Sequence, residues 1–148
     1  MFRHFARILL IGALGTALAT AATPVAVAQE PAVLTASLTG NATLVAKGAA
    51  VDVDFLYSCS SESPESISAG IFISTMTQRV GGGRLATGSG LSTESLVCDG
   101  AEHLTVVRVI ADGERAFKKG EAVVQGSANI CDASSCAEDP FSGTVRIR

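Results

Sequence analysis

The sequence of 148 residues has no tryptophan, one tyrosine and two histidines, of which only His103 lies beyond the first 28 residues. Hydrolysis by an activated serine needs a base within hydrogen-bond reach of the hydroxyl, and His103 alone is available for that role. A histidine at the start of an expected strand, beside Asp99 and Glu102, is more often a surface residue. We therefore predict that the protein is not an enzyme.

Long apolar runs are also scarce, because the longest, from Ile8 to Ala19, is shorter than the roughly 20 residues that cross a bilayer. Arg3 and Arg7 precede this run, and residues 26–28 end it in the Ala-x-Ala pattern of signal peptidase sites. We predict a cleaved signal peptide over residues 1–28, with an uncleaved anchor as the alternative. The expected mature protein is one secreted, extracellular domain over residues 29–148 that does not insert into a membrane.

Positive charge is in short supply in the expected mature chain. Removing Arg3 and Arg7 from the 11 Lys and Arg leaves nine, against 14 Asp and Glu, a net charge of −5. The sequence shows no run of basic residues that could displace counterions from phosphates. The negative net charge therefore argues against a nucleic-acid partner and against an anionic-membrane partner.

Four cysteines are present, all beyond residue 28: Cys59, Cys98, Cys131 and Cys136. An even number in an exported chain indicates disulfides, and three pairings are possible. We favour Cys59 with Cys98 and Cys131 with Cys136, because four intervening residues suit a bridge across a tight hairpin. Zinc is the weaker interpretation, since no C-x-x-C pair occurs.

The clearest strand is residues 51–59, where Val51, Val53, Phe55 and Tyr57 alternate with Asp52, Asp54 and Ser58. A second alternation puts Ala122, Val124, Gly126, Ala128 and Ile130 on one face. Further strands are expected at residues 33–39, 42–46, 69–78, 104–110 and 144–148. We also expect a Gly/Ser turn at residues 88–90 and a short strand or extended edge at residues 92–98.

No stretch shows a sustained 3.6-residue period, and turn signals recur throughout the mature chain. This pattern predicts an all-β fold, namely an immunoglobulin-like antiparallel two-sheet sandwich with two disulfides. Since the core tryptophan of antibody domains is absent, Tyr57 or Phe55 would take its place. A barrel with an apolar interior is the alternative architecture.

Several groups of charged residues could be interpreted as catalytic, calcium or anion sites, but each has a simpler explanation. Asp52 and Asp54 point the same way, as a glycosidase pair would, but a solvated outer face accounts for them. Asp132, Glu138 and Asp139 could hold calcium, although their spacing matches no known loop. Arg79 and Arg84 flank three glycines that could cradle an anion, yet a mobile hairpin tip is the simpler interpretation. We predict no metal and no cofactor.

Two resemblances can be named. Leu56-Tyr57-Ser58-Cys59, residues 97–103 and Lys119-Gly120-Glu121-Ala122 resemble a family of small secreted actinobacterial proteins known only as a domain of unknown function. That resemblance covers about residues 32–148 and implies the bridge between Cys59 and Cys98, but no activity. The chain is also similar to neocarzinostatin-like chromoprotein apoproteins, which have two disulfides, one closing a Cys-x-x-x-x-Cys loop. Their first bridge is short where this one is long, and they have a tryptophan.

Binding is then the favoured function. The small residues of 122–128 could leave a hollow for an apolar ligand, or could simply let two sheets approach. Contact with a protein partner would need exposed anchors, and we expect these at Phe72, Phe117 and Arg115. We predict a monomeric, non-enzymatic binding or envelope-associated module with an unknown protein or small-molecule partner. The alternative is a neocarzinostatin-like carrier of a small apolar ligand.

Overall fold

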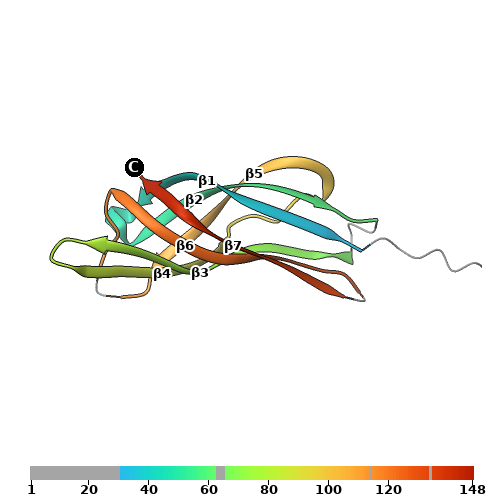
Figure 1. Cartoon of the computed structure of the whole chain (residues 1–148). Helices are drawn as coiled ribbons and strands as arrows, with labels where there is room; N and C mark the ends of the chain where they lie inside the picture. Colours follow the sequence, from blue (N-terminus) through green and yellow to red (C-terminus); the bar gives the residue numbers. More distant parts are fainter. Residues whose placement is uncertain (1–30, 63–65, 114, 134) are drawn as a thin grey trace, which may run out of the picture.

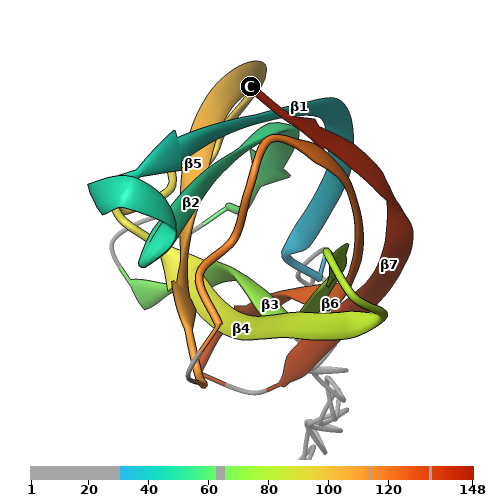
Figure 2. The same ribbon diagram turned by 90° about the vertical axis from the view of Figure 1, so that its left-hand side faces the viewer.

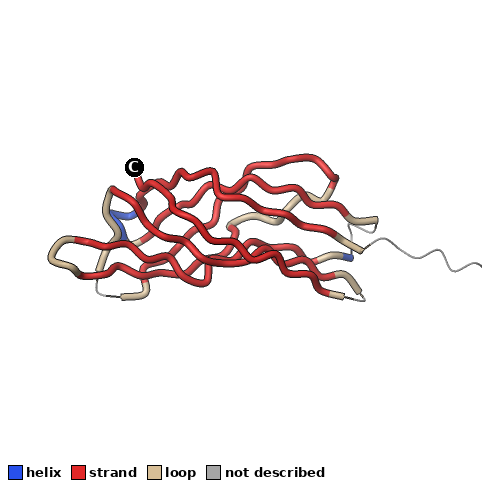
Figure 3. Tube along the Cα trace, in the orientation of Figure 1, coloured by secondary structure: helices blue, strands red, loops and turns tan. Residues whose placement is uncertain are grey.

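The computed structural model describes residues 31–62, 66–113, 115–133 and 135–148 (Figure 1). The predicted signal peptide, residues 1–28, lies outside the described residues. Seven strands make up most of the described chain (Figure 3), which confirms the all-β prediction. They are β1 (Val33–Val45), β2 (Ala50–Ser60), β3 (Ser68–Val80), β4 (Arg84–Ser92), β5 (Asp99–Ala111), β6 (Gly120–Cys131) and β7 (Cys136–Ile147), with a short 3-10 turn, η1 (Ala46–Gly48). None of the described helical residues forms a segment long and apolar enough to cross a membrane.

The strands form one closed barrel in the order β1-β2-β5-β4-β3-β6-β7. Neighbours are antiparallel except β1 and β7, which pair in parallel through Asn41 and Ala42 with Arg146 and Ile147. The prediction of two separate sheets is therefore wrong as stated. Only two short contacts close the barrel: the β1–β7 pair and the ladder between residues 88–92 of β4 and 107–111 of β5. The closed barrel is the architecture that the sequence predicted as the alternative.

The core follows the alternation of β2. Val51, Val53, Phe55 and Tyr57 are buried, as predicted, and Asp52 and Asp54 face outward. The other strands contribute buried side chains to the same cluster: Ile71, Ile73, Met76, Val107, Val109, Val124, Ile130, Val145 and Ile147. Burying an aliphatic or aromatic side chain of this size stabilises a fold by about 1.5–3 kcal/mol. The interior is thus filled with side chains from all seven strands, with Leu34 and Ala42 from β1 and Ala86 from β4.

Strand β1 joins the two segments that the sequence suggested. The register with β2 shifts between Leu38 and Ala42, and Gly40 lies at the shift with φ +80°. Residues with a side chain rarely adopt this backbone conformation, which explains why residue 40 is glycine. The shift re-aims the second half of β1, so that Ala42 reaches its pairing with β7.

Residues 88–90, predicted as a turn, lie inside β4 instead. A Cβ at Gly88 would collide with the carbonyl oxygen of Ile110, and a Cβ at Gly90 with that of Arg108. These glycines therefore permit close backbone approach between β4 and β5, which is the other reason for glycine in a strand. The pattern of Gly-Ser-Gly is typical of both situations.

The expected strand or extended edge at residues 92–98 is mostly a loop, because only Ser92 belongs to a strand. The loop is nonetheless fixed to its neighbours. The Thr93 amide donates to the Val106 carbonyl at 3.1 Å, and the Val97 amide donates to the Tyr57 hydroxyl at 2.9 Å. Its last residue, Cys98, is covalently bound to β2.

Both predicted disulfides are present. The bridge from Cys59 to Cys98 joins the end of β2 to the segment after β4. Cys131 and Cys136 are directly opposite each other in the β6–β7 ladder, with Cα atoms 4.0 Å apart. Because that ladder starts at Cys136, β7 is much longer than the predicted strand at residues 144–148. Residues 136–143 were not predicted as strand because their sequence has no apolar alternation.

Replacing Gly90 by alanine should weaken the β4–β5 closure. The added Cβ would displace the backbone of β5, and overpacking of this kind costs roughly 1–3 kcal/mol. Gly81→Ala is the matched control, because a Cβ there meets nothing within 4 Å and the free energy of unfolding should change by less than about 0.5 kcal/mol. Urea unfolding measures both, and equal effects would contradict the close approach at Gly90.

Cys59→Ser should destabilise the protein more than Cys136→Ser. The Cys59–Cys98 bridge joins residues 39 positions apart, and the Cys131–Cys136 bridge joins residues 5 positions apart. On the chain-entropy model these bridges contribute about 4 and about 2 kcal/mol to the free energy of unfolding. Thermal unfolding of the two variants compares them. An equal or larger loss in Cys136→Ser would show that loop length does not set the ranking.

Candidate functional site

Phe117 is not the exposed side chain that was expected of a partner contact. It does lie on the loop between β5 and β6, but its side chain is only 1% exposed. The loop folds back because the Phe117 amide donates to the Gly48 carbonyl at 2.9 Å, where a Cβ on residue 48 would collide with the Phe117 oxygen. Phe117 thereby joins the core cluster near η1.

The two other expected contacts are exposed but lie apart. Phe72 is 40% exposed on the outer side of β3, where its cross-strand neighbour in β4 is the exposed Leu91. Arg115 is exposed on the β5–β6 loop, beyond the end of β5. The structure does not bring Phe72, Arg115 and Phe117 together into one surface.

Of the two interpretations of residues 122–128, the structure does not show the hollow. Ala122, Val124 and Ala128 are buried in the core, and a Cβ at Gly126 would collide with the Phe72 carbonyl oxygen. The small side chains let β3 and β6 approach each other, which was the second interpretation of this series. These side chains are therefore part of the packed interior and line no open hollow on this face.

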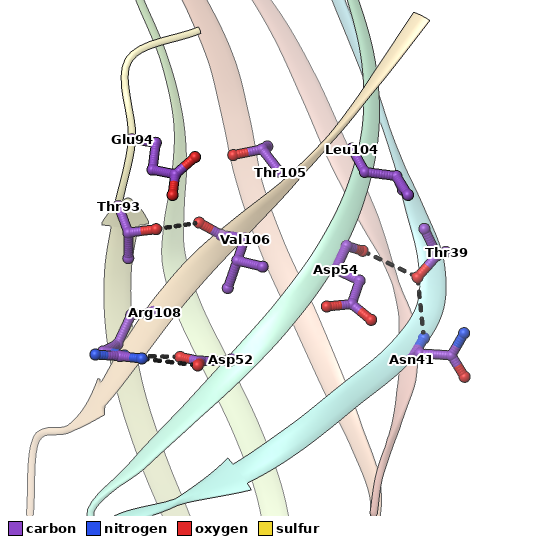
Figure 4. A pocket seen from close by; sticks show the side chains of 10 residues that line it. All are labelled: Thr39, Asn41, Asp52, Asp54, Thr93, Glu94, Leu104, Thr105, Val106 and Arg108. Atoms are coloured by element: carbon purple, nitrogen blue, oxygen red, sulfur yellow. Dashed lines mark hydrogen bonds and ion pairs between the residues drawn. The ribbon is translucent and has the colours of Figure 1, made fainter.

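A groove of about 610 Å³ instead crosses the outer side of β1, β2 and β5 (Figure 4). The segment after β4 forms one of its sides. Its lining combines hydroxyl, amide, charged and apolar side chains: Thr39, Asn41, Asp52, Asp54, Thr93, Glu94, Leu104, Thr105, Val106 and Arg108. The period of two in β2 and β5 places their alternate residues on this wall.

A bidentate ion pair fixes one end of the groove. Arg108 Nε and Nη2 donate to the two carboxylate oxygens of Asp52 at 2.7 and 2.8 Å, and these residues are directly opposite each other on β5 and β2. The hydrogen bonds from this guanidinium to Asp52 raise the pKa of Arg108 above its ordinary value. Two parallel hydrogen bonds hold both side chains in a defined orientation.

Two other carboxylates in the groove have no such partner. Asp54 and Glu94 make no side-chain hydrogen bond or ion pair with any residue of the described ranges. Near them Leu104 is 72% exposed, the largest exposure among the large apolar side chains described. Thr39 Oγ1 donates to the backbone oxygen of Asp54 at 3.1 Å and steadies the β1 wall. The groove therefore offers negative charge beside apolar surface.

The sequence indicated part of this groove. It placed Asp52 and Asp54 on one outward face, and we interpreted them as solvated. Arg108, Thr93 and Glu94 were missed, because they reach the groove only through the β2–β5 register and the path of the segment after β4. The outward position of Arg108 in an alternating strand was the available signal.

His103 lies away from the groove, near the Cys59–Cys98 bridge. Its Nε2 is 2.8 Å from Asp99 Oδ1, and its ring lies 5.5 Å from that of Tyr57 at 31°. Hydrogen bonds from His103 and, secondarily, from the Ala101 amide lower the pKa of Asp99 below 3.8. No hydroxyl of the described residues hydrogen-bonds to His103.

The remaining candidates are surface features. No group of three or more metal-ligating side chains occurs within the part of the chain that the structure describes, and Asp132 accepts a hydrogen bond from the Ser135 amide at 2.7 Å. The three glycines between Arg79 and Arg84 form the β3–β4 turn, where Gly82 and Gly83 have positive φ.

Searches of family models, curated proteins and solved structures give no match to this chain.

His103→Ala should raise the pKa of Asp99 toward 3.8, because it removes the largest cause of the shift. A carboxyl carbon titration by NMR measures the change. In the native protein the lowered pKa stabilises the fold above about pH 3.8, and this contribution is lost as the pH falls through the folded value. An unchanged Asp99 titration in His103→Ala would show that the Ala101 amide alone holds the carboxylate.

Proposed function

We propose that the protein is an exported, non-enzymatic binding module whose ligand occupies the groove on β1, β2 and β5. The observation that carries this proposal is that the carboxylates of Asp54 and Glu94, which have no partner among the described residues, share one groove with the exposed Leu104. Exposed apolar groups rimmed by polar ones are typical of interaction sites. The fitting ligand has a positive charge next to an apolar portion, as an extended protein segment with basic and aliphatic side chains does.

Export is supported by the sequence of residues 1–28 and by the two disulfides, which persist in oxidising compartments. The relation to immunoglobulin-like sandwiches, including the small secreted actinobacterial proteins, rests on strand connections. β1, β2 and β5 form one side of the barrel, β3, β6 and β7 the other, and β1 passes from β2 to β7. The barrel then corresponds to a sandwich whose two sheets are joined at their edges by the short β1–β7 and β4–β5 ladders.

The choice of binding module over carrier of an enclosed apolar ligand rests on burial. Phe55, Ile71, Ile73 and Met76 are fully buried and occupy the interior, whereas the groove is open and contains three carboxylates. Asp52 is already paired with Arg108, but a small apolar ligand would leave Asp54 and Glu94 without partners among the described residues and would gain little enclosure. A ligand that carries its own positive charge satisfies them.

Leu104→Ser and Asp54→Asn should each reduce ligand retention, because they remove the apolar and the anionic part of the groove. Leu85→Ser is the matched control, since this leucine is also exposed but lies on β4 outside the groove. Native mass spectrometry of each protein purified from its own culture medium measures bound mass. Equal retention by Leu104→Ser, Asp54→Asn and Leu85→Ser would contradict the assignment of the groove.

A further inference from the structure

Basic side chains gather at one end of the barrel. The described residues include nine Lys and Arg, and eight of them are exposed at the end where β1 and β7 finish; Arg108 is the exception. We call this set the basic end: Lys47, Arg79, Arg84, Arg115, Lys118, Lys119, Arg146 and Arg148. The segments that carry them, η1, the β3–β4 turn, the β5–β6 loop and the end of β7, surround the barrel's end (Figure 2).

These charges are not neutralised within the described chain. Its ion pairs are His103 with Asp99 and Arg108 with Asp52, and neither involves the basic end. The described carboxylate side chains at that end are Asp112 and Glu121. Glu114 lies outside the described residues. The excess of positive charge therefore faces solvent.

The opposite end has the opposite sign. Six acidic residues lie at or beside the strand ends there: Glu62, Asp99, Glu102, Asp132, Glu138 and Asp139. No described Lys or Arg accompanies them. Since the barrel is elongated along its axis (Figure 1), the charge separation gives the molecule a dipole along that axis.

The net charge of the mature chain predicted no anionic partner, and the fold removes the basis for that expectation. Four segments far apart in the sequence supply the basic end, so no run of basic residues is visible before folding. A local field depends on where charges lie and not only on their sum. The basic end can therefore attract anions although the protein is acidic.

We infer that the basic end docks the protein onto an anionic phospholipid surface, with the acidic end directed away from it. Each Lys or Arg near such a surface increases affinity roughly fivefold. A planar surface can contact all four segments at once, whereas a linear polyanion would follow only some of them. Laterally mobile headgroups also adjust to the arrangement of the side chains, whereas a second copy would offer carboxylates in fixed positions.

Vesicle sedimentation tests this inference on the purified protein. We expect binding to phosphatidylcholine vesicles that contain phosphatidylglycerol, release as salt is raised, and no binding to phosphatidylcholine alone. Changing Arg115, Lys118 and Lys119 together to glutamine should lower binding on the order of 100-fold. The matched control changes Glu102 and Glu138 to glutamine and Asp139 to asparagine, which should leave binding undiminished.

Four results would overturn the inference. The first is absence of binding to the anionic vesicles at low salt, and the second is equal binding to neutral ones. The third is an equal loss in both triple variants when circular dichroism shows that both are folded. The fourth is binding to soluble polyphosphate, or salt-sensitive self-association in sedimentation velocity, without vesicle binding; these would assign the basic end to a linear polyanion or to a second copy. The groove variants are not used here, so failure of this inference leaves the proposed function standing.

Discussion

The packing of β2 against the rest of the barrel constrains everything else in the molecule. Its inward side chains occupy the centre, where the Phe55 ring meets the edge of Phe141 from β7 at 5.0 Å between centroids. Contacts of this kind fill the space between the two sides of the barrel and leave none for a ligand. The proposed binding site is consequently on the outer surface, which the alternation of β2 and β5 supplies with charged residues.

The barrel's shape then separates two surfaces with different chemistry. The groove lies on the side wall, where Asp52 and Arg108 hold each other and Asp54 and Glu94 have no partner among the described residues. The basic end lies at the strand termini. Because these surfaces involve different residues, one can hold an anionic layer while the other remains open to a ligand. This arrangement agrees with an envelope-associated binding module.

The parts of the structure that depend on local pattern were predictable from the sequence. The buried face of β2, the faces of β6 and both disulfides follow from a period of two and from cysteine spacing. The closed barrel was only the alternative prediction, because closure depends on two short ladders, one of which joins the first strand to the last. Gly88 and Gly90 were assigned to a turn because glycine serves close approach and turns equally well.

The sites were harder to predict than the strands. Phe117 stands among basic residues and has the pattern of an exposed loop, yet a backbone hydrogen bond to Gly48 turns it into the core. Asp52 was placed on the correct face, but its pairing with Arg108 needs the register of β2 with β5. The basic end is invisible in sequence order, since its eight residues come from four segments. In each case the missing information is long-range.

The separation of the two surfaces can be measured directly by hydrogen exchange on the protein bound to anionic vesicles. Backbone amides of η1 and of the β3–β4 turn should exchange more slowly than in the free protein, while those of residues 93–98 beside the groove should be unchanged. Slower exchange at residues 93–98 with no change at η1 and the β3–β4 turn would contradict the orientation and the division of roles between the two surfaces.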